Sequence, residues 1–278
     1  MNITKEIGGT VQDPKKSNLL TRILSALIML PIAIYIILNG GLALVVLLNI
    51  ISVLILYEWN GICEKKPFSL LFVFQALCAS LMIWLQYVNS PYLIVTSYVS
   101  LSAVVVISLI SRSNFRWALL GYLYAIIPTL SFLLILKNSG GVVILWVMIV
   151  IWSMDTGAYF AGKNIGGPKM APKISPNKTW SGLIGGTITA VIFGGLYAYF
   201  QKGANIVLFE NATILLLLSG FLAVVSQVGD LAESAIKRKF NVKDSGAIIP
   251  GHGGIMDRVD GVLFVAPAVV FIEYLLYV

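Results

Sequence analysis

Two long stretches without a charged residue constrain what this chain can fold into. No Asp, Glu, Lys or Arg occurs from Ile23 to Tyr57, and none occurs from Pro67 to Ser111. A helix needs about 20 mostly apolar residues to cross a bilayer, so each stretch is long enough for two passes. A membrane β-barrel is excluded, because its strands are short segments of alternating polarity. These stretches therefore predict a polytopic α-helical membrane protein.

Composition supports the same conclusion. Only 11% of the residues are charged and the mean hydropathy is +0.92, whereas about a quarter of the residues in a soluble domain are charged. The expected fold class is all-α, a polytopic transmembrane bundle of about nine helices. The expected spans are Leu19–Leu38, Leu42–Trp59, two within Pro67–Ser111 that separate at Asn89, Trp117–Leu136, Gly141–Ala161, Ser181–Phe200, Ile206–Gly229 and Ile255–Val278.

The basic residues test this count independently. With the amino terminus in the cytoplasm, the segments that alternate onto the cytoplasmic side contain 17 of the 19 Lys and Arg, and only Lys137 and Lys202 lie outside. Basic residues favour cytoplasmic loops. One helix too many or too few would place later basic segments on the external side, so the observed separation supports the count. We therefore expect a cytoplasmic amino terminus and an external carboxyl terminus. The net charge of +7 then reports topology, and no nucleic-acid partner is expected.

The two halves of the chain differ. Residues 1–136 are expected to form about five amino-terminal transmembrane helices with short loops and few polar residues. Residues 137–278 are expected to form the catalytic transmembrane region, with cytoplasmic loops at 162–180 and 231–254 that contain most of the Pro, Gly and Lys. Chemistry is therefore expected at the cytoplasmic face of the carboxyl-terminal half.

Three carboxylates lie at membrane boundaries in that half. Asp230 ends the eighth expected helix, while Asp257 and Asp260 open the ninth and share one helical face. Acidic residues at membrane depth are expensive and are usually functional. Oxygen ligands of this kind suit Mg²⁺ bound together with a phosphate substrate, and a second cation is possible. The competing interpretation is a helix-end charge cluster in which the acids pair with Arg258 and nearby lysines. We favour metal binding.

The loop between these helices is basic and rich in glycine. Lys237, Arg238, Lys243 and Arg258 are cationic donors that can bind phosphate. The glycines beside His252 allow close approach of the backbone to a ligand. The competing interpretation is a solvated basic loop, which would not require the glycines. We expect His252 to donate a hydrogen bond to phosphate or to organise the loop rather than to act as a general base.

The other cytoplasmic loop contains four lysines and three prolines. Lys178 and Thr179 open the seventh expected helix, whose amino-terminal dipole favours an anion. The spacing does not match a Walker A loop. Asp155 precedes this loop by about two turns, and it either reaches the same site or only caps and hydrates its helix.

The string of residues 234–260 resembles the signature of the phosphatidate cytidylyltransferases, also called CDP-diacylglycerol synthases. It reads Ser-x-apolar-Lys-Arg from Ser234, then Lys-Asp from Lys243, then His-Gly-Gly from His252 and Asp-Arg-apolar-Asp from Asp257. Residues 155–182 also look like the family's second characteristic region. They depart from it at Ser181, where many members have an acid. The first half of the chain matches only in being hydrophobic.

The resemblance implies transfer of a cytidylyl group from CTP to phosphatidate, with Mg²⁺ and with an active site facing the cytoplasm from the bacterial inner membrane. A homodimer is consistent with it. Our hypothesis assigns Asp230, Asp257 and Asp260 to metal binding. Catalytic roles are expected for Lys237, Arg238, Lys243, Asp244, His252 and Arg258. Substrate binding is expected for Lys173, Ser175, Lys178, Thr179, Ser234, Gly253 and Gly254.

Two alternatives remain open from the sequence. A CTP-dependent lipid or polyprenol kinase would use similar groups. A cation-coupled transporter would also place acids in membrane helices, although it would more naturally place them near the bilayer midplane.

Overall fold

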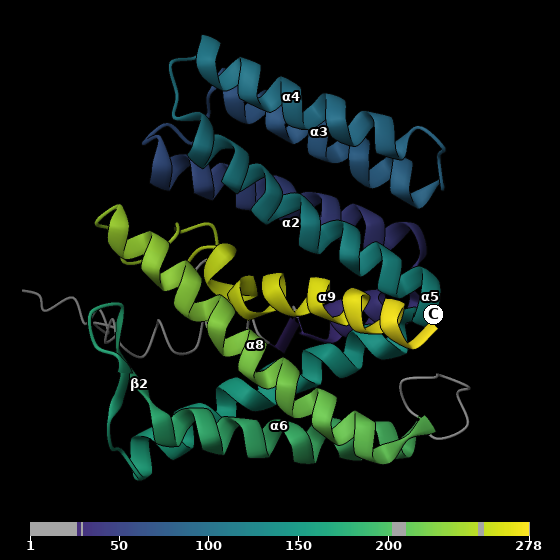
Figure 1. Ribbon diagram of the computed structural model, residues 1–278, viewed down its shortest axis with the longest axis vertical. Coiled ribbons are helices and arrows are strands. Elements are labelled where there is room, and N and C mark those ends of the chain that lie inside the picture. Colours follow the sequence, from purple (N-terminus) through teal and green to yellow (C-terminus); the bar gives the residue numbers. More distant parts are fainter. Residues whose placement is uncertain (1–26, 29, 202–209, 250–252, 278) are drawn as a thin grey trace, which may run out of the picture.

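The computed structural model describes residues 27–28, 30–201, 210–249 and 253–277, and it is predominantly helical. Over that part of the chain, seven helices are long and apolar enough to cross a membrane, and a shorter apolar helix spans Leu30–Asn39. The seven are α2 (Gly41–Cys63), α3 (Leu70–Tyr87), α4 (Leu93–Ile110), α5 (Phe115–Asn164), α6 (Trp180–Phe200), α8 (Ala212–Lys239) and α9 (Met256–Tyr277). They form a bundle with α3 and α4 at one side and α6 at the other (Figure 1). The predicted polytopic helical bundle is confirmed.

Helix α5 combines two of the expected passes. Its fifty residues are interrupted at Gly140, whose φ of 79° and ψ of 179° are not helical. A side chain at Gly141 would overlap the carbonyl oxygen of Ile37, so the helix Leu30–Asn39 packs closely against α5 at this break. The expected boundary between residues 136 and 137 therefore lies inside α5. The count of nine passes stays a prediction, since the first expected span begins outside the described residues.

Helix α8 is longer than predicted. The sequence suggested that the pass ends at Gly229 and that a loop begins at residue 231, but the helix continues to Lys239. This expectation was wrong because the apolar residues end at Gly229, whereas the polar residues that follow still favour a helix. The segment is rich in good helix formers, and Glu233 pairs with Lys237 one turn later. Ser234 and Lys237 therefore lie on a helix and not in a loop.

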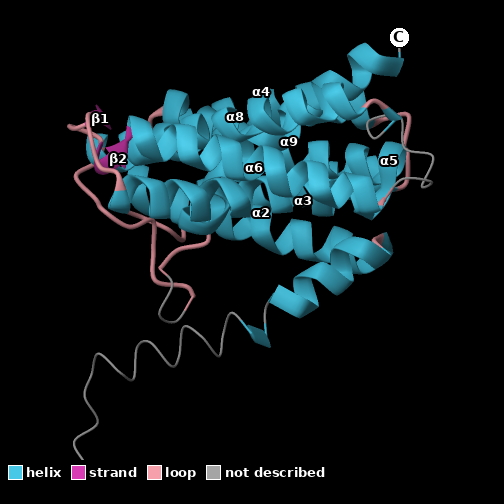
Figure 2. Cartoon of the chain, turned by 90° about the horizontal axis from the view of Figure 1, so that it is seen from below, coloured by secondary structure: helices cyan, strands magenta, loops and turns pink. Residues whose placement is uncertain are grey.

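The other expected loop contains a small sheet. Strands β1 (Lys169–Ala171) and β2 (Ser175–Thr179) pair antiparallel, with Lys169 opposite Thr179 and Ala171 opposite Ser175. The Thr179 hydroxyl then caps α6 by accepting a hydrogen bond from the backbone N–H of Gly182 at 3.1 Å. This hairpin is a departure from an all-α structure. It lies beyond the helix ends, at one end of the bundle (Figure 2).

Small residues bring the helices of the carboxyl-terminal half close together. A Cβ atom at Gly157 of α5 would overlap the Thr189 hydroxyl of α6. A Cβ atom at Gly229 of α8 would stand 2.7 Å from the carbonyl oxygen of Asp260 on α9. Glycine at helix contacts allows backbones to approach closely in membrane proteins. The acidic residues on α5, α8 and α9 are therefore held near one another.

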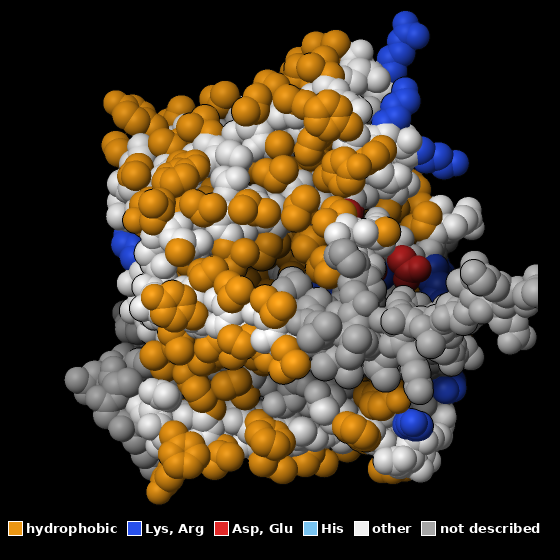
Figure 3. All heavy atoms as spheres, turned by 180° about the vertical axis from the view of Figure 1, so that it is seen from behind, with side chains coloured by type: hydrophobic (Ala, Val, Ile, Leu, Met, Phe, Trp, Pro, Cys, Tyr) orange, Lys and Arg blue, Asp and Glu red, His pale blue; other side chains and the backbone are white. Residues whose placement is uncertain are grey.

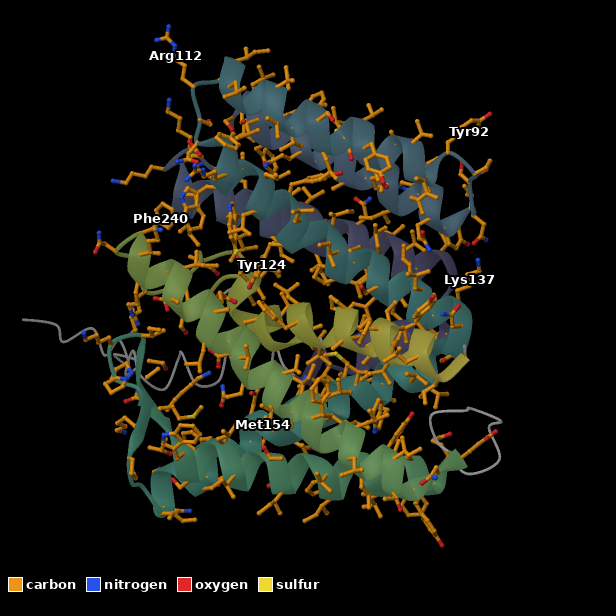
Figure 4. All side chains as sticks on the ribbon, viewed as in Figure 1. Tyr92, Arg112, Tyr124, Lys137, Met154 and Phe240 are labelled. Carbon is orange, nitrogen blue, oxygen red and sulfur yellow. The ribbon has the colours of Figure 1, made fainter. Side chains whose placement is uncertain are left out.

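The surface separates into an apolar face and polar ends. Hydrophobic side chains cover the face shown in Figure 3, and most of the visible Lys and Arg side chains lie at one edge of it. Arg112 and Phe240 lie at the same end of the bundle, while Lys137 and Tyr92 lie at the other (Figure 4). This separation agrees with the predicted alternation of loops. The orientation relative to the cytoplasm stays a prediction.

Candidate active site

A cavity of about 300 Å³ opens at the end of the bundle where the hairpin lies. Helices α5, α6 and α8 and the end of β2 all contribute to its wall. The lining residues are Asp155, Ala158, Tyr159, Asn177, Lys178, Thr179, Gly182, Gln227 and Asp230. Its volume is at the lower end of the range for small-molecule sites. Three residues of the predicted site, Lys178, Thr179 and Asp230, are thereby brought together.

Three carboxylates interact electrostatically with one lysine at this cavity. The Lys178 ammonium forms an ion pair with Asp230. Asp260 of α9 interacts electrostatically with Asp230, with Asp155 and with Lys178. We call Asp155, Lys178, Asp230 and Asp260 the cavity cluster. The cluster contains three carboxyl groups and one ammonium group, so it can bind a further positive charge.

Asp257 belongs to a different set of contacts. Its Oδ1 accepts a hydrogen bond from Lys237 Nζ at 2.6 Å. Its Oδ2 accepts from the Ser245 N–H at 3.0 Å, the Ser245 hydroxyl at 2.9 Å and the Gly254 N–H at 3.1 Å. Both carboxylate oxygens are therefore occupied by protein donors. The structure brings Asp230 and Asp260 together as predicted, but it places the third predicted metal ligand, Asp257, against Lys237.

Lys237 is buried between two carboxylates. Its side chain is 11% exposed, and its Nζ lies 2.9 Å from Oε1 of the fully buried Glu233 as well as 2.6 Å from Asp257 Oδ1. This burial excludes the interpretation of Lys237 as part of a solvated loop. It also differs from the expectation of a lysine that reaches phosphate directly, because its charge is already neutralised. Ser245 also contacts this group, and Glu58 contacts Ser245, as described below. We call Glu58, Glu233, Lys237, Ser245 and Asp257 the anchor cluster.

The remaining predicted residues are not members of these two clusters. Arg238 is exposed near the end of α8 and joins that helix to the turn between β1 and β2, since its Nε donates to the carbonyl oxygen of Ile174 at 3.3 Å. The Ser234 hydroxyl donates a long hydrogen bond of 3.4 Å to Asp230 Oδ1. Exposed positions are occupied by Lys173, Lys243, Asp244 and Arg258, while Ser175 is half-buried in β2 and Gly253 pairs with Ile249. His252 lies outside the described residues.

Ser181, where the resemblance led us to expect an acid, has local partners. Its hydroxyl donates to the carbonyl oxygen of Gly166 and lies 3.0 Å from the Thr179 hydroxyl. It therefore ties the start of α6 to the residues that follow α5. These contacts give the serine a role in shaping the loop beside the cavity.

Several residues of the clusters and of the cavity wall escaped the sequence analysis. Asp155 was left undecided, and Tyr159, Asn177, Gln227, Glu233, Ser245 and Glu58 were not singled out. A signal did exist for two of them, because Glu58 and Glu233 are ionisable residues at the edges of apolar helices, where such residues are usually functional. The polar residues of the cavity wall gave no such signal, since only the packing of α5, α6 and α8 brings them together.

Comparison with known proteins decides the family. The profile described as the cytidylyltransferase family matches residues 20–276. The chain belongs to this cytidylyltransferase family. It is 36% identical over 254 residues to a phosphatidate cytidylyltransferase of Brucella suis, covering 90% of this chain and 91% of the relative. It is 35% identical over 273 residues to the protein of that name from Bacillus subtilis, covering 92% and 97%.

Membership in the cytidylyltransferase family confirms several predictions. The resemblance seen in residues 234–260 is confirmed, and so is the assignment to nucleotidyl-transferring enzymes. The match also corrects one expectation. It begins at residue 20 and includes the amino-terminal helices, so the first half resembles the family in more than hydrophobicity. The relatives are bacterial, and the apolar helices indicate a multi-pass membrane protein.

Proposed function

We propose that this cytidylyltransferase transfers the cytidylyl group of CTP to phosphatidate, giving CDP-diacylglycerol and pyrophosphate. The observation that supports it best is the cavity cluster, in which Asp155, Lys178 and Asp230 line a space beside the residues of the family signature. Proteins named phosphatidate cytidylyltransferase that are 35–36% identical over most of both chains support the choice of substrates.

The reaction needs little activation of its nucleophile. A phosphate monoester oxygen of phosphatidate, already anionic at neutral pH, attacks the α-phosphorus of CTP. The bond from that phosphorus to the oxygen that bridges it to the β-phosphate breaks, and pyrophosphate leaves. The obstacle is repulsion between two polyanions, so electrostatic stabilisation should dominate catalysis. Lys178 lines the cavity, and we propose that the exposed Lys173, Arg238, Lys243 and Arg258 add positive charge for the phosphates.

The cavity cluster fits a magnesium ion. Among the described residues, no three acidic, His or Cys side chains are grouped tightly enough to hold a metal ion by themselves. Mg²⁺ does not require such a set, because it is commonly bound by one or two carboxylates together with substrate phosphates and water. We propose Asp230, Asp260 and Asp155 as the residues that hold it, and a second cation is possible. When bound, the ion would neutralise charge on the transferring phosphate.

The position of the cavity suits one water-soluble and one lipid substrate. It lies at the end of the bundle, where α5, α6 and α8 meet the hairpin (Figure 1). We propose that this end faces the cytoplasm, where CTP is available, and that the membrane is the bacterial inner membrane. We also propose a homodimer, with which the resemblance is consistent. Its mass in detergent, measured by light scattering, tests that part separately.

The deciding experiment uses purified protein in detergent with phosphatidate, Mg²⁺ and CTP labelled at either the α- or the γ-phosphate. We expect the α-label in the lipid fraction, with loss of the signal in EDTA. Appearance of the γ-label in lipid would instead indicate a CTP-dependent lipid kinase. Ion-driven transport in vesicles without any labelled lipid would indicate a transporter.

A further inference from the structure

Glu58 is a buried carboxylate at the end of an apolar helix. It lies in the last turns of α2, and its side chain is 2% exposed. A buried carboxylate is strongly destabilising unless hydrogen bonds or charges compensate for the lost water. The groups that compensate it therefore indicate what the residue does.

Those groups belong to the family signature and lie far away in the sequence. Oε1 of Glu58 accepts a hydrogen bond from the Ile255 N–H at 2.9 Å, and Oε2 accepts from the Met256 N–H at 2.8 Å. These two amides lie at the start of α9, where N–H groups lack partners within the helix and the helix dipole favours a negative charge. Oε2 also accepts from the Ser245 hydroxyl at 3.0 Å. Glu58 thus contacts the segment between α8 and α9 at Ser245 and again where the segment joins α9.

Two glycines of this segment make room for Glu58. A Cβ atom at Gly246 would stand 2.7 Å from Glu58 Oε1. One at Gly254 would stand 2.6 Å from the same oxygen and would overlap the Ser245 hydroxyl. The sequence suggested that Gly254 allows close approach of a substrate. The structure shows that its missing side chain is required by a carboxylate of the chain itself.

A chain of hydrogen bonds leads from Glu58 to the candidate site. The Ser245 hydroxyl lies within hydrogen-bond distance of both Glu58 Oε2 and Asp257 Oδ2, and its single hydrogen is shared between them. Asp257 in turn binds Lys237, and Asp260 follows one turn later on α9. The placement of the first turn of α9 therefore sets where Asp260 lies relative to the cavity.

We infer that Glu58 is a positioning residue for the transfer reaction. It fixes the start of α9 and the Ser245 hydroxyl, so that Asp257 meets Lys237 and Asp260 reaches the cavity cluster. The inference rests on the proposed function for the reaction that is affected, while the contacts themselves are independent of it. It also gives the amino-terminal half a role, because Glu58 of α2 holds part of residues 234–260, the stretch that carries the family signature.

The test compares the wild type with Glu58→Gln, Glu58→Asp and Ser245→Ala. A matched control is Glu210→Gln, which removes an exposed carboxylate just before α8; the first residue of that helix, Ala212, lies roughly 27 Å from Asp230 along the helix axis. Three quantities are measured in detergent: kcat and KM per folded molecule with α-labelled CTP and phosphatidate, the thermal midpoint, and hydrogen exchange of the Ile255 and Met256 amides.

We expect Glu58→Gln to lower kcat by ~10²-fold, the size of effect caused by a misplacement of about 1 Å. The amide nitrogen of Gln cannot accept the hydrogen bonds, so exchange at Ile255 and Met256 should accelerate. KM for either substrate should change by much less than kcat. Glu58→Asp should recover part of the rate, Ser245→Ala should lose less than Glu58→Gln, and Glu210→Gln should match the wild type.

A folded Glu58→Gln protein with wild-type kcat and exchange would overturn the inference. A lower thermal midpoint with unchanged kcat per folded molecule would also overturn it, because Glu58 would then only stabilise. If Glu58→Gln does not fold, wild-type values for both Glu58→Asp and Ser245→Ala would overturn it. If the wild type transfers no label, the proposed function fails, and hydrogen exchange alone then decides whether Glu58 holds the start of α9.

Discussion

Two groups of charged residues lie side by side at one end of this membrane protein, and they differ in what surrounds them. In the anchor cluster, Lys237 is flanked by Glu233 and Asp257, and all three are shielded from water. In the cavity cluster, Lys178 faces more carboxylates than it can neutralise, beside an open cavity of about 300 Å³. Charges that are buried in ion pairs with other protein groups hold structure, whereas surplus charge beside a cavity is available for a ligand.

The two clusters are connected through α8 and α9. Helix α8 contributes Asp230 to one and Glu233 to the other, and α9 contributes Asp260 to one and Asp257 to the other. Substitutions in the cavity cluster should therefore affect activity more than stability, and substitutions in the anchor cluster should affect stability as well. Measuring turnover and the thermal midpoint on the same variants separates the clusters.

The largest effect on activity is expected in the cavity cluster. Asp230→Asn and Asp260→Asn should each lower turnover by ~10³-fold, because each removes a carboxylate that we propose to hold the metal ion that neutralises the transferring phosphate. The thermal midpoint should stay close to that of the wild type, since neither residue has a full set of buried partners. Turnover is measured with α-labelled CTP over a range of Mg²⁺ concentrations. Near-normal turnover at saturating Mg²⁺ would remove these residues from the proposed metal site.

The largest effect on stability is expected at Lys237. Lys237→Ala leaves Glu233 and Asp257 as buried carboxylates without their cation, which typically costs about 3–5 kcal/mol. The thermal midpoint should fall strongly, and turnover should fall as well. Lys239→Ala is the control, because Lys239 is exposed two residues away on the same helix. A stable Lys237→Ala protein that lost only activity would instead support direct binding of phosphate by Lys237.

A smaller effect is expected when the space beside Glu58 is filled. Gly254→Ala forces a methyl group against Glu58 and the Ser245 hydroxyl, and overpacking of this kind usually costs about 1–3 kcal/mol. Gly61→Ala in α2 is the control, since its Cβ would make an ordinary contact of 3.5 Å with Pro67. Both midpoints are measured by thermal unfolding. Equal midpoints would show that the Gly254 segment can shift without loss.

The smallest effect is expected outside both clusters. Lys173 is exposed in the turn between β1 and β2. Lys173→Ala should raise KM for CTP by a few-fold at low salt, and the difference should shrink as salt screens the charge. Steady-state kinetics at two ionic strengths test this. A loss of kcat as large as that of Asp230→Asn would move Lys173 into the site itself.

Some features could be predicted because they depend on local sequence. Stretches such as Ile23–Tyr57 and Pro67–Ser111 predicted membrane helices, since bilayer thickness imposes a length of apolar residues. The end of α8 could not be found in the same way. Apolarity stops near Gly229, but the Glu233–Lys237 pair and the helix formers around it continue the helix to Lys239.

The candidate site was only partly predictable. Asp230, Lys178 and Thr179 were identified from their positions at helix ends, and they do line one cavity. Asp257 has the same residue type and nearly the same position as Asp260, so nothing in the local sequence separates them. Their surroundings differ because residues three apart on a helix are offset by about 60° around its axis. One therefore meets Lys237 while the other interacts with Asp230.

The sequence alone determined that this chain is a helical membrane protein and that its carboxyl-terminal half contains the signature of cytidylyl transfer. Apolar length and a dense run of fixed polar residues are local properties, and they can be read without knowing any contact. Only the tertiary structure decided which acids face the cavity and which are neutralised, and it alone joined Glu58 to Ser245, Ile255 and Met256. Burial and hydrogen bonding at this site depend on residues nearly two hundred positions apart in the sequence. Only the packing of the helices brings such residues into contact.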